Sequence, residues 1–230
     1  MASEKDIMVE AVDINKEYRR AGAIIRALAD VNLKIKSGEF IIVQGPTGCG
    51  KSTLLNVLSG LDLPDSGRII FDGENIARAT EDRLSRLRRH KIGFVFQDFN
   101  LVNTLTAIEN IEAVLWPTVL RQKEIENRAI SALRDVNLLD RKDHFPAQMS
   151  GGEKQRCGIA RAIVHRPRVI LADEPTGNLD PKSETQVMDL LKKINKEMET
   201  TVIVVTHRAS LSSYANKVIK MDKGRIVSIK

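Results

Sequence analysis

Short runs of apolar residues recur along the 230-residue chain, and their lengths and compositions are those of β-strands. Some are continuous rather than alternating, as in strands that a sheet buries on both faces. These are residues 40–43, 92–96, 168–172 and 201–205. The segments between them carry apolar residues at helical spacing. This order of strands and helices predicts one large α/β domain with a mainly parallel sheet.

Further elements are predicted around this framework. Strands are expected at residues 7–13, at 28–35 (where Leu33 and Ile35 alternate with lysines), at 68–71, and as a pair in the tail 217–230. Helices are expected at 53–58, 81–91, 106–136 with a break at Pro117, and 150–164. A last helix is expected to follow Asp180 and Pro181, a typical N-cap and first-turn proline. Its predicted core face carries Val187, Leu191, Ile194 and Met198.

Composition narrows the class of protein. A hydrophobic fraction of 42% is enough to fill a core, and 230 residues are too few for two nucleotide-binding units with linkers. The net charge of +6 favours anionic partners but does not separate nucleic acid from a lipid surface. No apolar stretch approaches the roughly 20 residues of a membrane span, and the N-terminus lacks a secretory pattern. Cys49 and Cys157 form no disulfide framework, which fits a reducing cytosol.

The strongest chemical signal is a glycine-rich loop between the run 40–43 and the predicted helix 53–58. It fits G-x-x-x-x-G-K-[ST], in which backbone N–H groups converge on phosphate oxygens and the next helix adds its positive end. Lys51 would reach the β- and γ-phosphates, and the Ser52 hydroxyl would ligate Mg²⁺. The alternative is a turn with a surface lysine, but the flanking strand and helix favour a nucleotide site. The expected binding residues are Gly45, Pro46, Thr47, Gly48, Cys49, Gly50, Lys51, Ser52 and Thr53.

Polar residues that follow the buried strands are the candidates for catalysis, because open α/β sheets bind ligands beyond the carboxyl ends of their strands. Asp173 would hold Mg²⁺, and Glu174 would orient or deprotonate the attacking water. The alternative is an acidic surface pair that caps the next segment. Gln97 also follows a buried strand and is weak evidence alone. His207 ends another strand, from which it would reach a γ-phosphate.

Three features have both a structural and a functional interpretation. Ser150 and Glu153 form a capping box, which does not explain the two glycines between them; a helix N-terminus open to phosphate would. Tyr18 would either stack on an adenine base or be an ordinary half-buried tyrosine at a strand end. The basic run 81–91 lacks interleaved aromatics, which favours a solvated helix face over a nucleic-acid patch.

Taken together, these motifs resemble those of the ATP-binding cassette (ABC) ATPases across essentially the whole chain. Residues 46–52 are similar to the Walker A loop, Gln97 to the Q-loop, 149–153 to the family signature and 169–173 to Walker B, with Glu174 in the catalytic glutamate position. Residues 178–180 resemble the D-loop, His207 the switch histidine and Tyr18 the adenine-stacking residue. Segments 93–101 and 172–180 resemble the stand-alone ATPases of lipoprotein-releasing and macrolide-export transporters and their cell-division relative.

The resemblance implies a P-loop NTPase core with a mainly parallel sheet, an antiparallel β lobe and an α-helical lobe. These would form a single domain over 1–230, with the core in 1–97 and 166–230 and the helical lobe in 98–165. Two copies would sandwich two ATP molecules head to tail. Each P-loop would then face residues of the other copy, and Mg²⁺ would lie on the P-loop side. The nucleotide contacts from the partner would be Ser150, Gly151 and Gly152. Asp180 is a further expected nucleotide contact, and the Mg²⁺ site would comprise Ser52, Gln97 and Asp173.

The implied activity is ATP hydrolysis, with ATP and Mg²⁺ as cofactors. The chain would be a cytoplasmic subunit at the inner face of the cell membrane, where it powers an integral membrane partner. The alternative is a regulatory module that recruits or activates an envelope enzyme without transport. Nucleic acid is not an expected partner, because repair relatives carry long coiled coils and translation relatives carry two cassettes. The transported substrate and its direction stay open.

Two residues depart from the family signature. Met149 stands where the signature usually has Leu, and Glu153 stands where it usually has Gln. The first exchange keeps an apolar side chain. The carboxylate of Glu153 would either lie near the incoming nucleotide or fold back as the capping box suggests. The strength of ATP-driven dimerisation depends on which of these holds.

Overall fold

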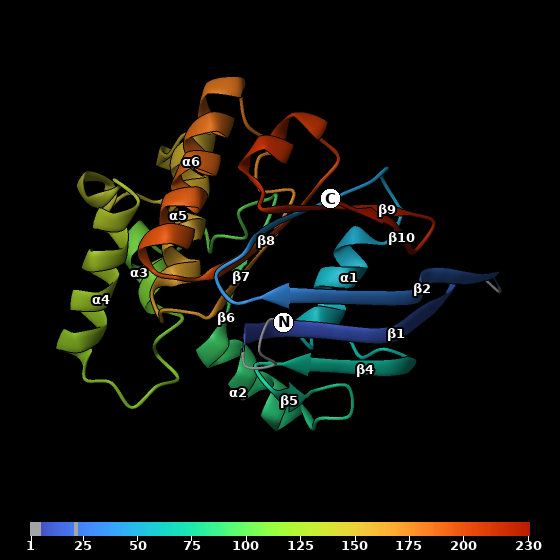
Figure 1. The fold of residues 1–230 in the computed structure, drawn as a ribbon. Coiled ribbons are helices and arrows are strands. Elements are labelled where there is room, and N and C mark those ends of the chain that lie inside the picture. Colours follow the sequence, from blue (N-terminus) through green and yellow to red (C-terminus); the bar gives the residue numbers. More distant parts are fainter. Residues whose placement is uncertain (1–5, 21–22) are drawn as a thin grey trace.

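The computed structural model describes residues 6–20 and 23–230, and its central element is a six-stranded sheet (Figure 1). All neighbouring strands pair in parallel except β10, which is added antiparallel at one edge. The order across the sheet is β10 (Arg225–Ile229), β9 (Lys217–Asp222), β3 (Phe40–Gln44), β8 (Thr201–Thr206), β7 (Val169–Asp173) and β6 (Ile92–Val95). The predicted α/β fold with a mainly parallel sheet is confirmed.

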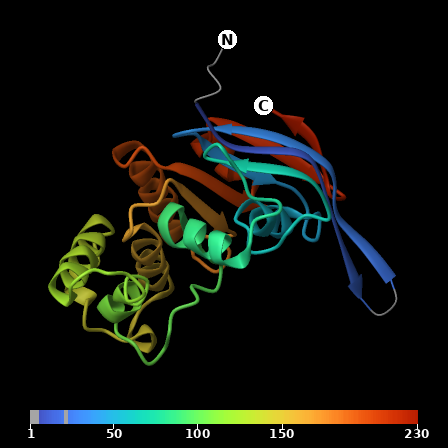
Figure 2. The same cartoon turned by 90° about the horizontal axis from the view of Figure 1, so that it is seen from below.

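A second sheet is antiparallel throughout. Its order is β2 (Ala23–Lys36), β1 (Ile7–Arg20), β4 (Ser66–Phe71) and β5 (Glu74–Asn75). The strands predicted at 7–13 and 28–35 are present but longer, because β1 and β2 stay paired as far as Arg20 and Ala23. This outer part is largely exposed, and its apolar residues Ile24 and Ile25 do not alternate with polar ones or pack in a core. Figure 2 shows it extending beyond the rest of the molecule.

The described residues form six α-helices, and most of them lie on one side of the parallel sheet (Figure 1). α1 (Lys51–Leu58) follows β3 and lies between the two sheets. The others are α2 (Glu81–Lys91), α3 (Ala107–Glu112), α4 (Gln122–Asp135), α5 (Gly151–Ile163) and α6 (Pro181–Glu197), with short 3₁₀ turns at η2 (Leu139–Arg141), η3 (Pro146–Gln148) and η4 (Ala209–Tyr214). The predicted break at Pro117 separates α3 from α4. None of the described helices is long and apolar enough to cross a bilayer.

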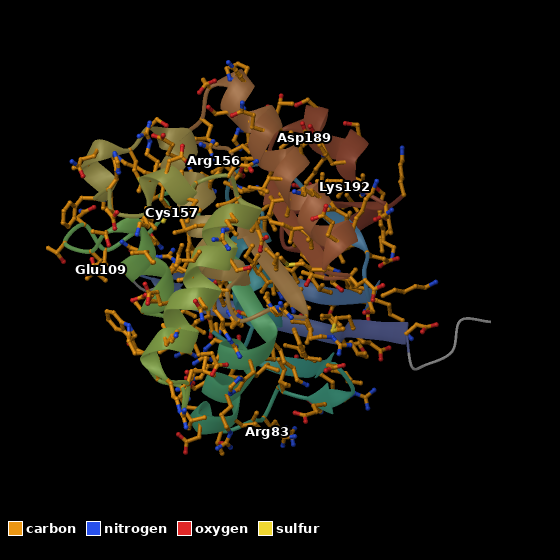
Figure 3. All side chains as sticks on the ribbon, turned by 90° about the vertical axis from the view of Figure 1, so that its left-hand side faces the viewer. Arg83, Glu109, Arg156, Cys157, Asp189 and Lys192 are labelled. Carbon is orange, nitrogen blue, oxygen red and sulfur yellow. The ribbon has the colours of Figure 1, made fainter. Side chains whose placement is uncertain are left out.

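The parallel strands are apolar throughout because their two faces border two different cores. Successive side chains of a strand point to opposite faces. In β3, Phe40 and Ile42 pack in the core beneath α3, α4, α5 and α6, whereas Ile41 and Val43 pack in the core shared with α1 and the antiparallel sheet. β7 and β8 alternate in the same way. α5 packs against α3, α4, α6 and β6, and Figure 3 shows it beside α6.

Candidate active site

The glycine-rich loop joins β3 to α1 in a conformation that only glycine adopts without strain at two positions. Gly48 and Gly50 have φ values of 79° and 104°, in the left-handed region. A Cβ on Gly50 would also collide with the carbonyl oxygen of Ala27 in β2. Gly50 is the N-cap of α1 and offers no side-chain acceptor. The first N–H groups of α1 are therefore free to bind phosphate oxygens.

Lys51 lies folded across this loop. Its Nζ donates to the carbonyls of Gly45 at 2.9 Å and Pro46 at 3.0 Å, and only 6% of the side chain is exposed. The same Nζ lies 4.0 Å from Oε1 of Glu174. The ammonium group is therefore held at the mouth of the loop, where it stabilises negative charge.

Ser52 and Asp173 meet beside the loop, at the carboxyl end of β7. The Ser52 hydroxyl donates to Asp173 Oδ1 at 3.1 Å. Burial raises the pKa of Asp173, and the hydrogen bond from Ser52 opposes that shift. Among the described residues, no group of three or more His, Cys, Asp or Glu side chains is arranged to hold a metal. A hard cation here would take these two oxygens and complete its shell with phosphate and water, as Mg²⁺ commonly does.

Glu174 directly follows Asp173, and its carboxylate lies near two other predicted catalytic residues, Lys51 and His207. Its Oε1 lies 3.1 Å from Nδ1 of His207 and 4.0 Å from Nζ of Lys51. Its backbone has a φ of 44°, in the left-handed region, and its N–H donates to the carbonyl of Val205 at 3.0 Å. A non-glycine residue in this conformation is strained, and such strain is found mainly at functional sites.

The Mg²⁺ prediction requires Gln97 to lie with Ser52 and Asp173, but its side chain instead contacts the segment at residue 178. Its Nε2 donates to Oδ1 of Asn178 at 3.3 Å, and Nδ2 of Asn178 donates to Oδ1 of Asp98 at 2.9 Å. Within the described residues, no hydrogen bond joins Gln97 to Ser52 or Asp173. Its role as a metal ligand stays a prediction.

Ser150, Gly151 and Gly152 form the start of α5, away from the P-loop of the same chain. The predicted capping box is present: Ser150 N–H donates to Glu153 Oε2 at 2.8 Å, and Glu153 N–H donates to Ser150 Oγ at 3.3 Å. Asp180 caps α6 by accepting from the N–H groups of residues 182 and 183. No hydrogen bond between described residues joins this group to the P-loop, so one chain presents two separate halves of the predicted site.

Glu153 is folded back onto its own helix end. Besides the capping bond, its Oε1 accepts from Nε of Arg141 at 3.0 Å. The backbone N–H of Ser150 is the main cause that lowers the pKa of Glu153 to about 2, and Arg141 adds to it. The negative charge that departs from the family signature is therefore compensated within the chain.

Replacing Glu153 should produce a stability loss that depends on pH. We expect Glu153→Ala to lower the free energy of unfolding by about 1–2 kcal/mol near neutral pH, because a cap and an ion pair are lost. Since the folded-state pKa of about 2 lies below the ordinary value of 4.5, this contribution is complete above 4.5 and disappears as pH falls toward 2. Urea unfolding at a series of pH values measures it.

The matched control is Glu124→Ala, which removes an exposed Glu124–Arg128 pair one helical turn apart. Such pairs contribute about 0.5 kcal/mol or less. A stability difference between Glu153→Ala and wild type that stays constant down to acid pH would contradict the assignment.

Tyr18 is anchored at a strand end, and its stacking on an adenine base stays a prediction. Its hydroxyl donates to Oδ2 of Asp62 at 2.7 Å, so it is anchored at the end of β1, and about a third of the residue remains exposed. The ammonium of Lys16 lies 5.3 Å from the ring centroid and 2.7 Å from Asp62 Oδ1. The ring is therefore held in place by its edge and is available on one face.

The structure also shows two polar side chains of α5, the buried Gln155 and the half-buried Arg161, whose contacts the sequence did not predict. Gln155 donates to the carbonyls of Phe96 and Pro175, and Arg161 donates to those of Phe99 and Asn100. The only hint in the sequence was a polar residue within a helical stretch, 155–163, that carries several apolar residues. It does not identify the acceptors, because Pro175 lies 20 residues away and the other three lie 59 to 62 residues away.

The fold and this site define a P-loop nucleotide-binding protein, and comparison with known proteins gives the family. Residues 28–177 match the family model described as ABC transporter. The chain is 46% identical over 222 residues to an uncharacterized ABC transporter ATP-binding protein of Methanocaldococcus jannaschii, covering 96% of this chain and 99% of that protein. It is 41% identical to the macrolide export ATP-binding/permease protein MacB of Brucella abortus, over 96% of this chain and 34% of MacB.

Solved structures agree with these sequence matches. The ATP-binding cassette MJ0796 of M. jannaschii, in a dimeric post-hydrolysis state bound to ADP and Pi, has a TM-score of 0.89 at 41% identity. That match covers 97% of this chain and 98% of the other. The chain belongs to the ABC transporter family, as an ATP-binding cassette. The protein is an ABC-type ATPase, which converts ATP and water to ADP and phosphate.

Proposed function

We propose that this ATPase works as a head-to-tail dimer whose closing around two ATP molecules drives an integral membrane subunit. Its place would be the cytoplasmic side, at the inner face of the cell membrane. The work done would be export, lipoprotein release or mechanotransmission. The observation that carries this proposal is the division of the predicted site into two halves within one chain. The P-loop of one copy would be completed by the start of α5 from the other.

The helix geometry supports this arrangement. Among the described residues, no hydrogen-bond acceptor is paired with the N–H groups of Gly151 and Gly152 at the start of α5, and Glu153 is compensated by Arg141 rather than directed at an incoming phosphate. A second positive helix end would therefore meet the γ-phosphate opposite α1. The dimeric structure of MJ0796 with ADP and Pi supports the same assembly for this chain.

The roles within each half follow from the contacts. Ser52 and Asp173 would hold Mg²⁺, with Gln97 joining when nucleotide is bound; the ion would neutralise charge on the β- and γ-phosphates. Lys51 would stabilise the same charge from the P-loop. Glu174 would position and deprotonate the water, and His207, 3.1 Å from its carboxylate, would orient Glu174 toward the γ-phosphate.

The helical lobe, residues 98–165, would transmit the motion to the membrane subunit, while 1–97 and 166–230 would form the core. The link between α3 and α4 presents large apolar side chains to solvent: Trp116 is 52% exposed and Val119 is fully exposed. Exposed apolar side chains that lie together mark contact surfaces. MacB, whose name joins ATP-binding and permease functions, supports a permease-type partner.

Affinity capture tests the proposed function. Tagged Glu174→Gln protein, loaded with ATP and Mg²⁺, should hold the closed dimer and retain its partner from native membranes. Recovery of a protein with membrane spans supports the proposal, and that protein's outer domain would indicate whether it moves cargo or recruits an enzyme. Recovery of soluble proteins or nucleic acid alone, without a closed dimer, would overturn it.

The proposed stacking role of Tyr18 leads to a prediction about base selectivity. We expect Tyr18→Ala to weaken binding of both ATP and GTP by about tenfold, because stacking depends on the π-face rather than on base edges. Tyr18→Phe keeps the ring and loses the bond to Asp62, so its affinity should stay within about twofold. Fluorescence titration of the monomer measures both. Equal affinities for Tyr18→Ala and wild type would leave Tyr18 with only its structural role.

A further inference from the structure

The side chain of Gln155 bridges the ends of two neighbouring strands from inside α5. It is fully buried, and its Nε2 donates to the carbonyl of Phe96 at 3.2 Å and to that of Pro175 at 2.7 Å. Phe96 directly precedes Gln97, and Pro175 directly follows Glu174. One amide therefore fixes the backbone next to two residues of the predicted catalytic site.

α5 holds the other end of the same segment as well. The half-buried side chain of Arg161 donates from its guanidinium to the carbonyl of Phe99 at 2.8 Å and to that of Asn100. Phe99 and Asn100 both have left-handed backbone conformations, with φ values of 62° and 47°. The segment that carries Gln97 is thus attached to α5 at both ends.

The hydrogen bonds of the Gln155 side chain are all made by one atom of its amide. Nε2 donates to both carbonyls, whereas Oε1 is buried and has no hydrogen-bond partner among the described residues. Cys157 and Ile159 of the same helix are buried and apolar. Both polar contacts of this buried side chain therefore go to the backbone beside Gln97 and Glu174.

We propose that Gln155 is a positioning residue for ATP hydrolysis. It ties the orientation of α5, whose first turn carries Ser150 to Gly152, to the placement of Gln97 and Glu174. Hydrolysis then reaches full rate only while α5 lies in this orientation against the strand ends. This inference rests on the roles proposed above for Gln97 and Glu174. Gln155 touches no reacting atom itself.

The test compares Gln155→Met with Gln186→Met, which makes the same exchange at an exposed position of α6. We expect Gln155→Met to lower kcat by about 10- to 100-fold, the scale of a small misplacement of catalytic groups. KM and the Kd for ATP should stay within about twofold, since the P-loop is untouched. Gln186→Met should match wild type. A kcat per folded molecule within about twofold of wild type would overturn the proposal.

A double-mutant cycle shows whether Gln155 acts through Gln97. Gln97→Ala and Gln155→Met combined should cost little more than the larger single effect, whereas effects that multiply would overturn the coupling through Gln97. If Gln97→Ala alone leaves kcat unchanged, the role proposed for Gln97 and the coupling through it fall together. If it lowers kcat and Gln155→Met does not, only the inference falls. Should Gln155→Met not fold, Gln155→Leu, which also buries no charge, is measured by the same criteria.

Discussion

Glu174→Gln is expected to lower ATP turnover by about 100- to 10,000-fold while leaving ATP binding within about twofold. The amide keeps the size of the side chain and its reach to His207 and Lys51, but it cannot accept a proton from water. Because the ATP-bound form then persists, the protein should elute as a dimer with ATP and Mg²⁺ and as a monomer with ADP. Phosphate release and light scattering measure the two effects.

Glu197→Gln is the matched control, since Glu197 is an exposed carboxylate at the end of α6. Its turnover should equal that of wild type. Turnover of Glu174→Gln at the wild-type rate would refute the catalytic assignment of Glu174. Slow turnover without ATP-driven dimers would keep that assignment and refute the proposed sandwich.

Gly50→Ala is expected to abolish nucleotide binding, with a loss of at least about 100-fold in ATP affinity. Two effects add at this position: φ is 104°, and the new Cβ would collide with the carbonyl oxygen of Ala27. That oxygen belongs to the backbone of β2, so it has little freedom to move, and the P-loop itself must be displaced. Calorimetric titration with ATP and a thermal melt measure the effect.

Gly73→Ala separates the two causes. Gly73 has a comparable φ of 80°, but a Cβ there would meet no atom within 4 Å. It should therefore lose about 1 kcal/mol of stability from backbone strain and keep its ATP affinity. Normal ATP binding by folded Gly50→Ala would show that the P-loop tolerates the displacement and that the close approach to β2 is not required.

Much of the fold could be predicted from the sequence because its signals are local. The continuous runs 92–96 and 201–205 reflect burial on two faces, and α2 begins at Glu81 and ends at Lys91 as predicted. The outer halves of β1 and β2 could not be predicted, because they are stabilised by pairing with each other rather than by apolar burial. Their boundaries depend on a partner strand that local composition does not encode.

In the candidate site, too, the contacts with local sequence signals could be predicted and the others could not. Lys51, Glu174 and His207 could be predicted to meet because each follows a strand of one parallel sheet. In the structure, Nζ of Lys51 lies 4.0 Å and Nδ1 of His207 lies 3.1 Å from Oε1 of Glu174. The contact of Gln97 with Asn178 and the bridge made by Gln155 depend on how α5 packs against the strand ends. Such contacts are set by tertiary packing, which spacing along the chain does not reveal.

The alternation of Phe40, Ile41, Ile42 and Val43 between two cores has a consequence for how this protein evolves. A change of side-chain volume at Phe40 or Ile42 alters the packing against α3, α4, α5 and α6. A change at Ile41 or Val43 alters the packing against α1, which follows the P-loop. Neighbouring residues of one strand are thus constrained by different parts of the protein. Substitutions that refit the helices can accumulate on one side of the sheet while the packing around α1 on the other side stays constant.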